Sequence, residues 1–379
     1  MQYVELGKIK DKVSRFGLGC MRLPSIETAD GKKEIDDEEA IKLIRSAIDR
    51  GVNYIDTAYA YGRSEEVVGK ALQDGYREKV TLVTKIPMGS AESHEDLYRI
   101  FDEQCRRLQT DYIDVYFLHN MNMGSWPLVK KYDAIKFMYD LKAKGKIKHC
   151  GFSMHERPEL LEEILDVYEQ CDLVMIQYNY LDKFNQAGRR GVEILAERGI
   201  PVTVMEPLRG GLLAGEIPGK ITEAFGDFHP EMSHVEKSFM WLYNQPEIKV
   251  VLSGSSSMEQ LDDSLRIFEN AKSGVLTEDD EKIYDAARAE WNKMVKVGCT
   301  GCAYCVPCPA NVNIPEIFRM YNETAKSKNP QKWLYKAILG NAGEDASKCL
   351  ECGACEGKCP QKIAIIEKLK EADEELLKP

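Results

Sequence analysis

Short apolar runs of strand length alternate with amphipathic segments of helix length from residue 16 to residue 270. The segment 37–50 illustrates the helical pattern, since its apolar side chains recur with the period of a helix at Ala40, Ile41, Ile44, Ala47 and Ile48. The segments 93–108 and 259–270 follow the same pattern. The strand-like runs are residues 16–21, 52–55, 80–84, 113–118, 147–152, 173–177, 201–205 and 249–252. Eight strand–helix units predict an α/β fold whose parallel strands close into a (β/α)8 TIM barrel.

Two stretches depart from this alternation. Residues 208–235 are rich in Gly and Pro and too irregular for the barrel wall, so we interpret them as a lid or substrate loop. Past Val297 the chain becomes rich in Cys, Pro and Gly. We therefore expect a barrel domain at 1–296 and a small, mainly α-helical domain at 297–379, with helix-like pieces at 314–324 and 331–339.

Composition narrows the class of protein. A net charge of −11 argues against binding to nucleic acid. No apolar run approaches the ~20 residues of a membrane helix, and the N-terminus lacks the basic-then-apolar pattern of a signal peptide. These features predict a cytoplasmic protein that binds neither membrane nor nucleic acid.

Three consecutive predicted strands each end in an ionisable side chain. The run 52–55 leads into Asp56, the run 80–84 into Lys85, and the run 113–118 into His119, while Tyr61 lies in the loop after Asp56. A barrel gathers consecutive strand ends around one mouth, so these side chains are expected to meet there. An ion pair that ties two strands together is the alternative interpretation of Asp56 and Lys85, but it leaves the other two residues unexplained.

These positions resemble the aldo/keto reductase family over roughly residues 1–295. Its motifs D-T-A-x-x-Y-G-x-S-E, T-K at a strand end, and D-x-x-x-L-H are matched by Asp56 to Glu65, by Thr84-Lys85, and by Asp114 to His119. The resemblance implies a catalytic tetrad that interconverts a carbonyl and an alcohol. Tyr61 would be the general acid, His119 would orient the substrate oxygen, and Asp56 would hold Lys85. A free phenol has a pKa of about 10, which the Lys85 ammonium is expected to lower.

The resemblance also implies a cofactor, NADP or NAD, although the match is partial. Ser153 and Gln177 stand where the family holds the nicotinamide carboxamide, but Met154 replaces the usual Asn. The pyrophosphate and adenosine region is matched by Gly254, Ser255, Ser257, Gln260 and Asp263. Gly254 and Gln260 replace the Lys and Arg of many NADPH-dependent members, so no preference for NADP is expected. The partial loss of nicotinamide contacts also leaves room for a flavin in the barrel mouth.

The cysteines gather in two runs near the C-terminus. Cys299, Cys302, Cys305 and Cys308 precede Pro309, and Cys349, Cys352, Cys355 and Cys359 precede Pro360. The second run matches the bacterial ferredoxin pattern for [4Fe–4S] clusters. Pairs of the form C-x2-C also bind zinc, but two such runs favour two [4Fe–4S] clusters. In two-cluster ferredoxins the fourth cysteine serves the other cluster, which groups Cys359 with the first three cysteines and Cys308 with Cys349, Cys352 and Cys355.

Together these features predict an oxidoreductase with a small-molecule carbonyl or alcohol as substrate. Its clusters would exchange electrons with a ferredoxin or another electron-transfer protein. Hydride carriers move electron pairs whereas clusters move single electrons, so a direct link between them needs a converter such as a flavin. Two alternatives remain open: an NAD(P)H-dependent reductase with purely structural clusters, and a non-enzymatic electron carrier or redox sensor.

Overall fold

The computed structural model describes residues 1–6, 9–28, 33–215, 217–324 and 335–377. Packing divides the chain into two compact units, and each is described by itself. The barrel unit comprises Met1–Pro207 and Glu236–Leu276. The other unit, called the iron–sulfur unit after the clusters that its cysteine runs predict, comprises Leu208–Val235 and Thr277–Pro379. Within the described ranges, no helix is both long and apolar enough to cross a membrane.

Eight parallel strands form the closed barrel that the sequence predicts. Around the barrel, each strand is hydrogen-bonded to its neighbours in chain order, and the last strand pairs with the first. The strands are β3 (Phe16–Gly19), β6 (Tyr54–Asp56), β7 (Thr81–Pro87), β8 (Ile113–Met121), β9 (Ile147–Met154), β10 (Leu173–Gln177), β11 (Val202–Met205) and β12 (Ile248–Ser253).

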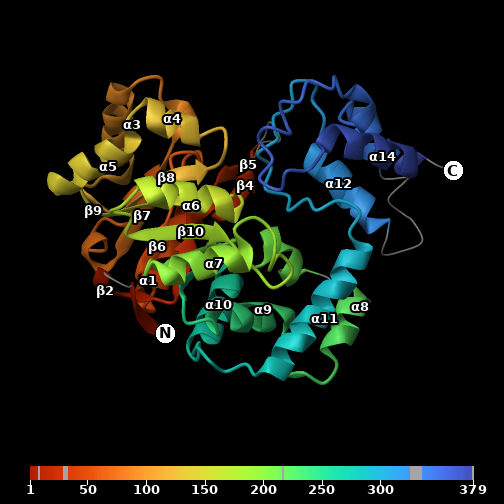
Figure 1. Cartoon of the computed structure of the whole chain (residues 1–379), viewed down its shortest axis with the longest axis horizontal. Coiled ribbons are helices and arrows are strands. Elements are labelled where there is room, and N and C mark those ends of the chain that lie inside the picture. Colours follow the sequence, from red (N-terminus) through yellow and green to blue (C-terminus); the bar gives the residue numbers. More distant parts are fainter. Residues whose placement is uncertain (7–8, 29–32, 216, 325–334, 378–379) are drawn as a thin grey trace. The chain divides into compact units, whose positions relative to one another are not determined.

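Helices follow the strands and cover the outside of the barrel (Figure 1). They are α1 (Asp37–Asp49), α2 (Ser64–Ala71), α3 (His94–Leu108), α4 (Trp126–Lys131), α5 (Ala134–Ala143), α6 (Pro158–Val167), α7 (Gly188–Glu197), α9 (His234–Tyr243) and α10 (Met258–Phe268). The first turn of α3 is capped by Ser93, whose hydroxyl accepts a hydrogen bond from the Asp96 amide. Ser257 caps α10 in the same way through the Gln260 amide.

An N-terminal hairpin contributes to the barrel interior. Strands β1 (Tyr3–Leu6) and β2 (Ile9–Ser14) pair antiparallel. Their Leu6 and Val13 join a buried cluster with strand residues Tyr54, Val83, Val115, Phe117, Leu173, Met175, Val250 and Leu252. The close packing of the strands explains why residue 151 is a glycine, since a Cβ at Gly151 would lie 1.9 Å from the Leu173 carbonyl oxygen.

The iron–sulfur unit is mainly helical. It contains α8 (Gly219–Phe225), α11 (Glu278–Met294), α12 (Ile314–Glu323), α14 (Ile365–Leu377) and a short π-helical turn at Tyr335–Gly340. Residues 331–334 of one expected helix lie outside the described residues. Helices α12 and α14 share an apolar core that includes Ile317, Phe318, Leu369 and Ala372.

The stretch 208–235 is more ordered than its composition predicts. It contains α8, which packs along α11. The rings of Phe225 and Phe228 lie edge-on to Tyr284 of α11, with centroids 5.3 and 5.7 Å away. A capping box of Thr277 and Asp280 fixes the start of α11.

Candidate active site and cluster sites

The ends of β6, β7 and β8 bring Asp56, Lys85 and His119 together at one edge of the barrel. The parallel register pairs Asp56 with Val83 and Lys85 with Phe117, so each functional residue lies two positions beyond the partner of the preceding one. An offset of two residues keeps all three side chains on the same face of the sheet. All three side chains are buried, whereas Tyr61, from the loop that follows β6, is half-buried. The three strand-end side chains are therefore buried, and Tyr61 is the most exposed residue of the four.

Lys85 makes the shortest contacts of the group. Its Nζ donates to Asp56 Oδ1 at 2.6 Å and to the Thr57 carbonyl at 2.8 Å. The same Nζ lies 5.0 Å from the centroid of the Tyr61 ring. Burial lowers the pKa of Lys85 and raises the pKa of Asp56, and in each case the partner's charge opposes that shift. The ion pair is thus the arrangement that keeps both groups charged in a buried place.

The Tyr61 phenol is held beside His119 and stays protonated. The two rings meet edge to face, with centroids 5.7 Å apart. The sequence argument expected Lys85 to lower the pKa of the phenol, but the structure gives the opposite net direction. Burial raises the pKa of Tyr61 well above its ordinary value, and the negative charges of Asp56 and Glu206 add to that effect.

His119 is neutral in this environment. Burial lowers its pKa well below the ordinary value, and the charges of Lys85 and His155 add to the shift. Its Nδ1 is buried and has no hydrogen-bond partner within the described part of the chain. A neutral imidazole that faces a phenol can donate or accept one hydrogen bond to a substrate oxygen.

Sequence reasoning missed two residues near this group. His155 follows the end of β9, and its charge acts on His119. Glu206 follows the end of β11, and its charge acts on Tyr61. The signal that found Asp56 and Lys85, an ionisable residue at a strand end, applies to both when it is extended to the later strands.

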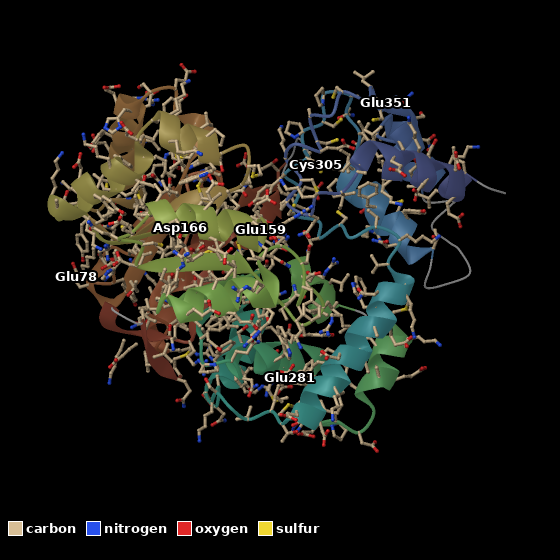
Figure 2. All side chains as sticks on the ribbon, in the orientation of Figure 1. Glu78, Glu159, Asp166, Glu281, Cys305 and Glu351 are labelled. Carbon is tan, nitrogen blue, oxygen red and sulfur yellow. The ribbon has the colours of Figure 1, made fainter. Side chains whose placement is uncertain are left out.

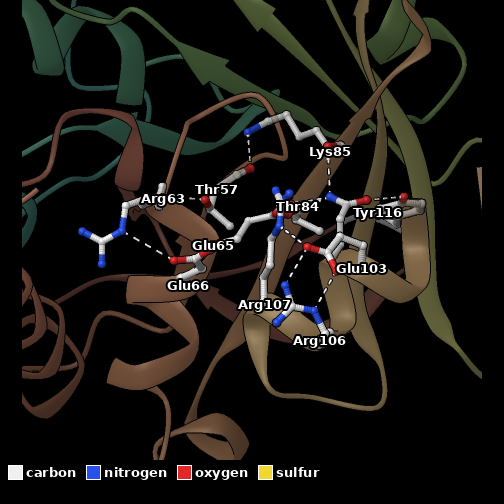
Figure 3. A network of polar contacts seen from close by, with 12 residues as sticks. Thr57, Arg63, Glu65, Glu66, Thr84, Lys85, Glu103, Arg106, Arg107 and Tyr116 are labelled. Atoms are coloured by element: carbon white, nitrogen blue, oxygen red, sulfur yellow. Dashed lines mark hydrogen bonds and ion pairs between the residues drawn. The ribbon is translucent and has the colours of Figure 1, made fainter. Parts of the chain in front are cut away.

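A third missed residue is Gln104, which supports the strand that carries Lys85. Figure 3 shows Glu65, Thr84 and Tyr116, which take part in the same network of polar contacts. Its Nε2 donates to Glu65 Oε1 at 2.7 Å and to the Lys85 carbonyl at 3.2 Å. Its Oε1 accepts from the Tyr116 hydroxyl at 2.6 Å, and Thr84 donates to the same Glu65 oxygen at 2.7 Å. The bond to the Lys85 carbonyl fixes the backbone at that residue, and the bonds with Glu65 and Tyr116 hold the Gln104 side chain in place. No sequence pattern pointed to Gln104, because it lies on the buried face of α3.

The two residues expected near the nicotinamide are both buried in the barrel. Ser153 accepts a hydrogen bond from the Asn120 amide at 2.9 Å. Gln177 donates to Asp182 at 2.8 Å, and its own Oε1 is buried without a hydrogen-bond partner among the described residues. A buried amide oxygen in this state suits a ligand that donates a hydrogen bond, as a carboxamide does.

The expected phosphate loop lies between β12 and α10. The Ser255 hydroxyl is buried and has no hydrogen-bond partner in the ranges that the structure describes, and Ser257 caps the helix. These features suit phosphate oxygens at a helix N-terminus. Gln260 instead accepts from the Ser256 amide at 2.9 Å, and Asp263 pairs with Arg266 at 2.7 Å. Gly254 lies close to the end of β3, since a Cβ added at Gly254 would lie 3.4 Å from the Gly19 carbonyl oxygen.

The first cysteine run surrounds a small cavity in the iron–sulfur unit. Cys299, Cys302 and Cys305 line it together with Cys359, and the remaining wall is largely apolar, from Ile314, Phe318, Ile363 and Ile365. Figure 2 labels Cys305 within this unit. Burial raises the pKa of Cys299 to about 11, and the nearby Cys302 and Cys359 add to it. In the described part of the chain, no three His, Cys, Asp or Glu side chains come together as they do around a single metal ion. Four thiols spread around a cavity fit a cluster, whose irons lie between them.

The second run is less enclosed. Cys308, Cys349 and Cys355 are partly buried against the core of α12 and α14, and Cys352 is exposed. Cys308, Cys349 and Cys355 therefore pack against the same apolar core as Cys299 and Cys305. The other four cysteines, at positions 20, 105, 150 and 171, lie in the barrel unit.

Comparison with known proteins identifies both parts of the chain. The model of the aldo/keto reductase family matches residues 15–289, and that of the 4Fe-4S dicluster domain matches residues 298–364. Aldo-keto reductase YhdN of Bacillus subtilis is 30% identical over 273 residues, which span 69% of this chain and 76% of that protein. The NADH-specific methylglyoxal reductase of Escherichia coli is 25% identical over 307 residues, which span 69% of this chain and 91% of that protein.

Solved structures agree with this assignment. The holo form of aldo-keto reductase AKR11C1 from Bacillus halodurans matches with a TM-score of 0.63 and 26% identity, covering 76% of this chain and 96% of that one. The chain therefore belongs to the aldo/keto reductase family. It is an oxidoreductase of that family with a C-terminal 4Fe-4S dicluster domain.

Proposed function

We propose that this protein interconverts small carbonyl compounds and alcohols, with Tyr61 as the general acid. The observation that carries the proposal is the half-buried Tyr61 phenol, whose ring centroid lies 5.0 Å from the buried Lys85 ammonium and 5.7 Å from the neutral His119 ring. Reduction of a carbonyl adds a hydride to the carbon and a proton to the oxygen. Tyr61 holds that proton in the resting site, because burial and the charge of Asp56 keep the phenol neutral.

The other residues stabilise the transfer of the proton. The Lys85 ammonium is near enough to the ring to favour the phenolate that forms when the proton leaves. Asp56 holds Lys85 in place and balances its charge. His119, neutral and edge-on to the phenol, orients the substrate oxygen through a hydrogen bond. In the alcohol-oxidising direction the same groups take the proton back.

The hydride comes from a nicotinamide, which supplies or accepts it at the ring when bound. The buried oxygen of Gln177 and the Ser153 hydroxyl would hold the carboxamide, and Ser255 with the start of α10 would hold the pyrophosphate. Gly254 and Gln260 supply no cation for a 2′-phosphate, which supports NAD as well as NADP. The Escherichia coli relative, by its name, is specific for NADH and reduces methylglyoxal, which supports a small carbonyl substrate.

We further propose that the C-terminal domain begins at residue 297 and holds two [4Fe–4S] clusters. The four thiols around the apolar cavity support Cys299, Cys302, Cys305 and Cys359 as one ligand set. Cys349, Cys352, Cys355 and Cys308 would form the other. The clusters would pass single electrons to or from a separate redox protein, a ferredoxin for example, with a flavin as the converter between electron pairs and single electrons.

Anaerobically purified protein tests the proposal in one experiment. Iron, sulfide and flavin are assayed, then NADH or NADPH is added, with and without methylglyoxal. The proposed function requires substrate-dependent oxidation of the nicotinamide, and loss of that activity in Tyr61→Phe. Cluster reduction by the nicotinamide, seen by electron paramagnetic resonance, would support the electron-transfer role. Turnover without any cluster reduction would leave the clusters structural.

A further inference from the structure

Arg209 is a buried arginine of the iron–sulfur unit that lies beside the first cysteine run. Its Nη1 donates to the Cys299 carbonyl at 3.5 Å, and its Nη2 donates to the Gly298 carbonyl at 3.4 Å. Its guanidinium also lies over the ring of Trp291 of α11, 5.0 Å from the centroid. The side chain is 4% exposed, so the positive charge is held close to Cys299 with little water around it.

The backbone at this arginine has an unusual conformation. Arg209 has φ of +49°, and Gly210 and Gly211 follow with φ of +69° and +101°. Glycine adopts such values readily, but a residue with a Cβ does so at a cost. The contacts of the guanidinium with Trp291 and the two carbonyls hold the turn in this form. The chain therefore directs a buried cation to the cysteine run through a turn that a glycine would form more easily.

We propose that Arg209 is the cationic partner of the cluster bound by Cys299, Cys302, Cys305 and Cys359. A [4Fe–4S] cluster with four thiolate ligands carries a net negative charge, which grows when an electron is added. A nearby positive charge with little solvent screening stabilises the reduced form more than the oxidised form. Arg209 therefore raises the reduction potential of this cluster and helps to retain it. This inference rests on the proposed cluster ligands but not on the proposed carbonyl chemistry.

Two substitutions separate the charge from the shape of the side chain. Arg209→Gln removes the charge, and Arg209→Lys keeps a charge while it loses the planar fork and its stacking on Trp291. Lys282→Gln is the matched control, because it removes one positive charge from α11 at an exposed position nine residues before Trp291, about 14 Å along the helix. Each full-length protein is purified anaerobically, assayed for iron, and titrated with a reductant while the cluster signals are followed by electron paramagnetic resonance.

The expected result is a lower midpoint potential for one of the two clusters in Arg209→Gln. Arg209→Lys and Lys282→Gln should stay near the parent value. Loss of about half of the iron from Arg209→Gln, with retention by Arg209→Lys, would also support the role of the charge. Unchanged potentials and full iron in Arg209→Gln would overturn the proposal, as would equal iron loss from both arginine variants, which would make the contact purely structural. A parent protein without clusters would instead refute the proposed ligand sets.

Discussion

Lys85 Nζ lies 2.6 Å from Asp56 Oδ1, and the two side chains are 1% and 5% exposed. A buried pair of this kind is costly to break from one side, because the remaining charge loses its partner but stays out of water. The contribution of this ion pair to the stability of the fold is therefore best measured with variants of both residues.

Asp56→Asn should destabilise the barrel unit by about 3–5 kcal/mol. The double variant Asp56→Asn/Lys85→Met should lose less than the sum of the two single variants, since it leaves no uncompensated charge. Chemical denaturation followed by circular dichroism measures all three variants against the parent. Strictly additive losses would contradict the coupling of the two side chains.

Tyr61→Phe should lower the turnover of a test carbonyl such as methylglyoxal by about 10²- to 10⁴-fold, the usual contribution of a general acid. Folding and iron content should not change, because the phenol is half-buried and lies in the barrel unit. Tyr59→Phe is the control, because Tyr59 lies in the same loop as Tyr61. Its ring centroid is 4.4 Å from the guanidinium carbon of Arg107 in α3. Turnover of Tyr61→Phe near the parent rate would end the assignment of Tyr61 as the acid.

The anaerobic protein should hold about eight irons and eight sulfides, from two four-iron clusters. The exchange of fourth cysteines predicts that Cys305→Ser/Cys359→Ser retains about four irons, because both changes fall on one cluster. Cys355→Ser/Cys359→Ser should lose both clusters, and Cys105→Ser should lose neither. The opposite pattern would assign Cys359 to its own sequence run, and zinc as the main metal would reject clusters altogether.

NADP should bind no more than about tenfold more tightly than NAD, a difference of about 1.4 kcal/mol. The reason is that Gly254 and Gln260 bring no cation to the 2′-phosphate. Gln260→Arg should then improve binding of NADP and leave NAD nearly unchanged. Fluorescence titration of each cofactor gives both dissociation constants. A hundredfold preference of the parent protein for NADP would show that another cation serves this phosphate.

The barrel should lose stability as the pH falls below about 6.5. Burial lowers the pKa of His155 from 6.5 to about 4 and lowers the pKa of His119 in the same direction. Between pH 6.5 and pH 4 the unfolded chain binds protons at these histidines that the folded chain does not. The free energy of unfolding is therefore highest above about pH 6.5 and falls toward pH 4. For His155 the full decrease in the free energy of unfolding is about 3 kcal/mol, since folding lowers its pKa from 6.5 to about 4.

His155→Gln should flatten this loss when denaturation is measured at pH 5 and at pH 7. His229→Gln, a change at an exposed histidine, is the control and should keep the slope of the parent. An unchanged slope in His155→Gln would mean that folding does not lower the pKa of His155.

The sequence by itself determined the eight strand–helix units, the family motifs and the two cysteine runs. These features are local, because periodicity, caps and ligand spacing are recorded within a few consecutive residues. The proposed catalytic tetrad was visible for the same reason, since Asp56, Lys85 and His119 each stand at the end of an apolar run.

Only the tertiary structure decided which distant groups share an environment. Closure of the barrel brings the charges of His155 and Glu206 to bear on His119 and Tyr61, and packing of α3 puts Gln104 behind Lys85. Folding of the iron–sulfur unit places Cys359 and Arg209 beside the first cysteine run. Burial also decided the direction of the pKa of Tyr61, since the loss of water around a group depends on segments far away in the chain.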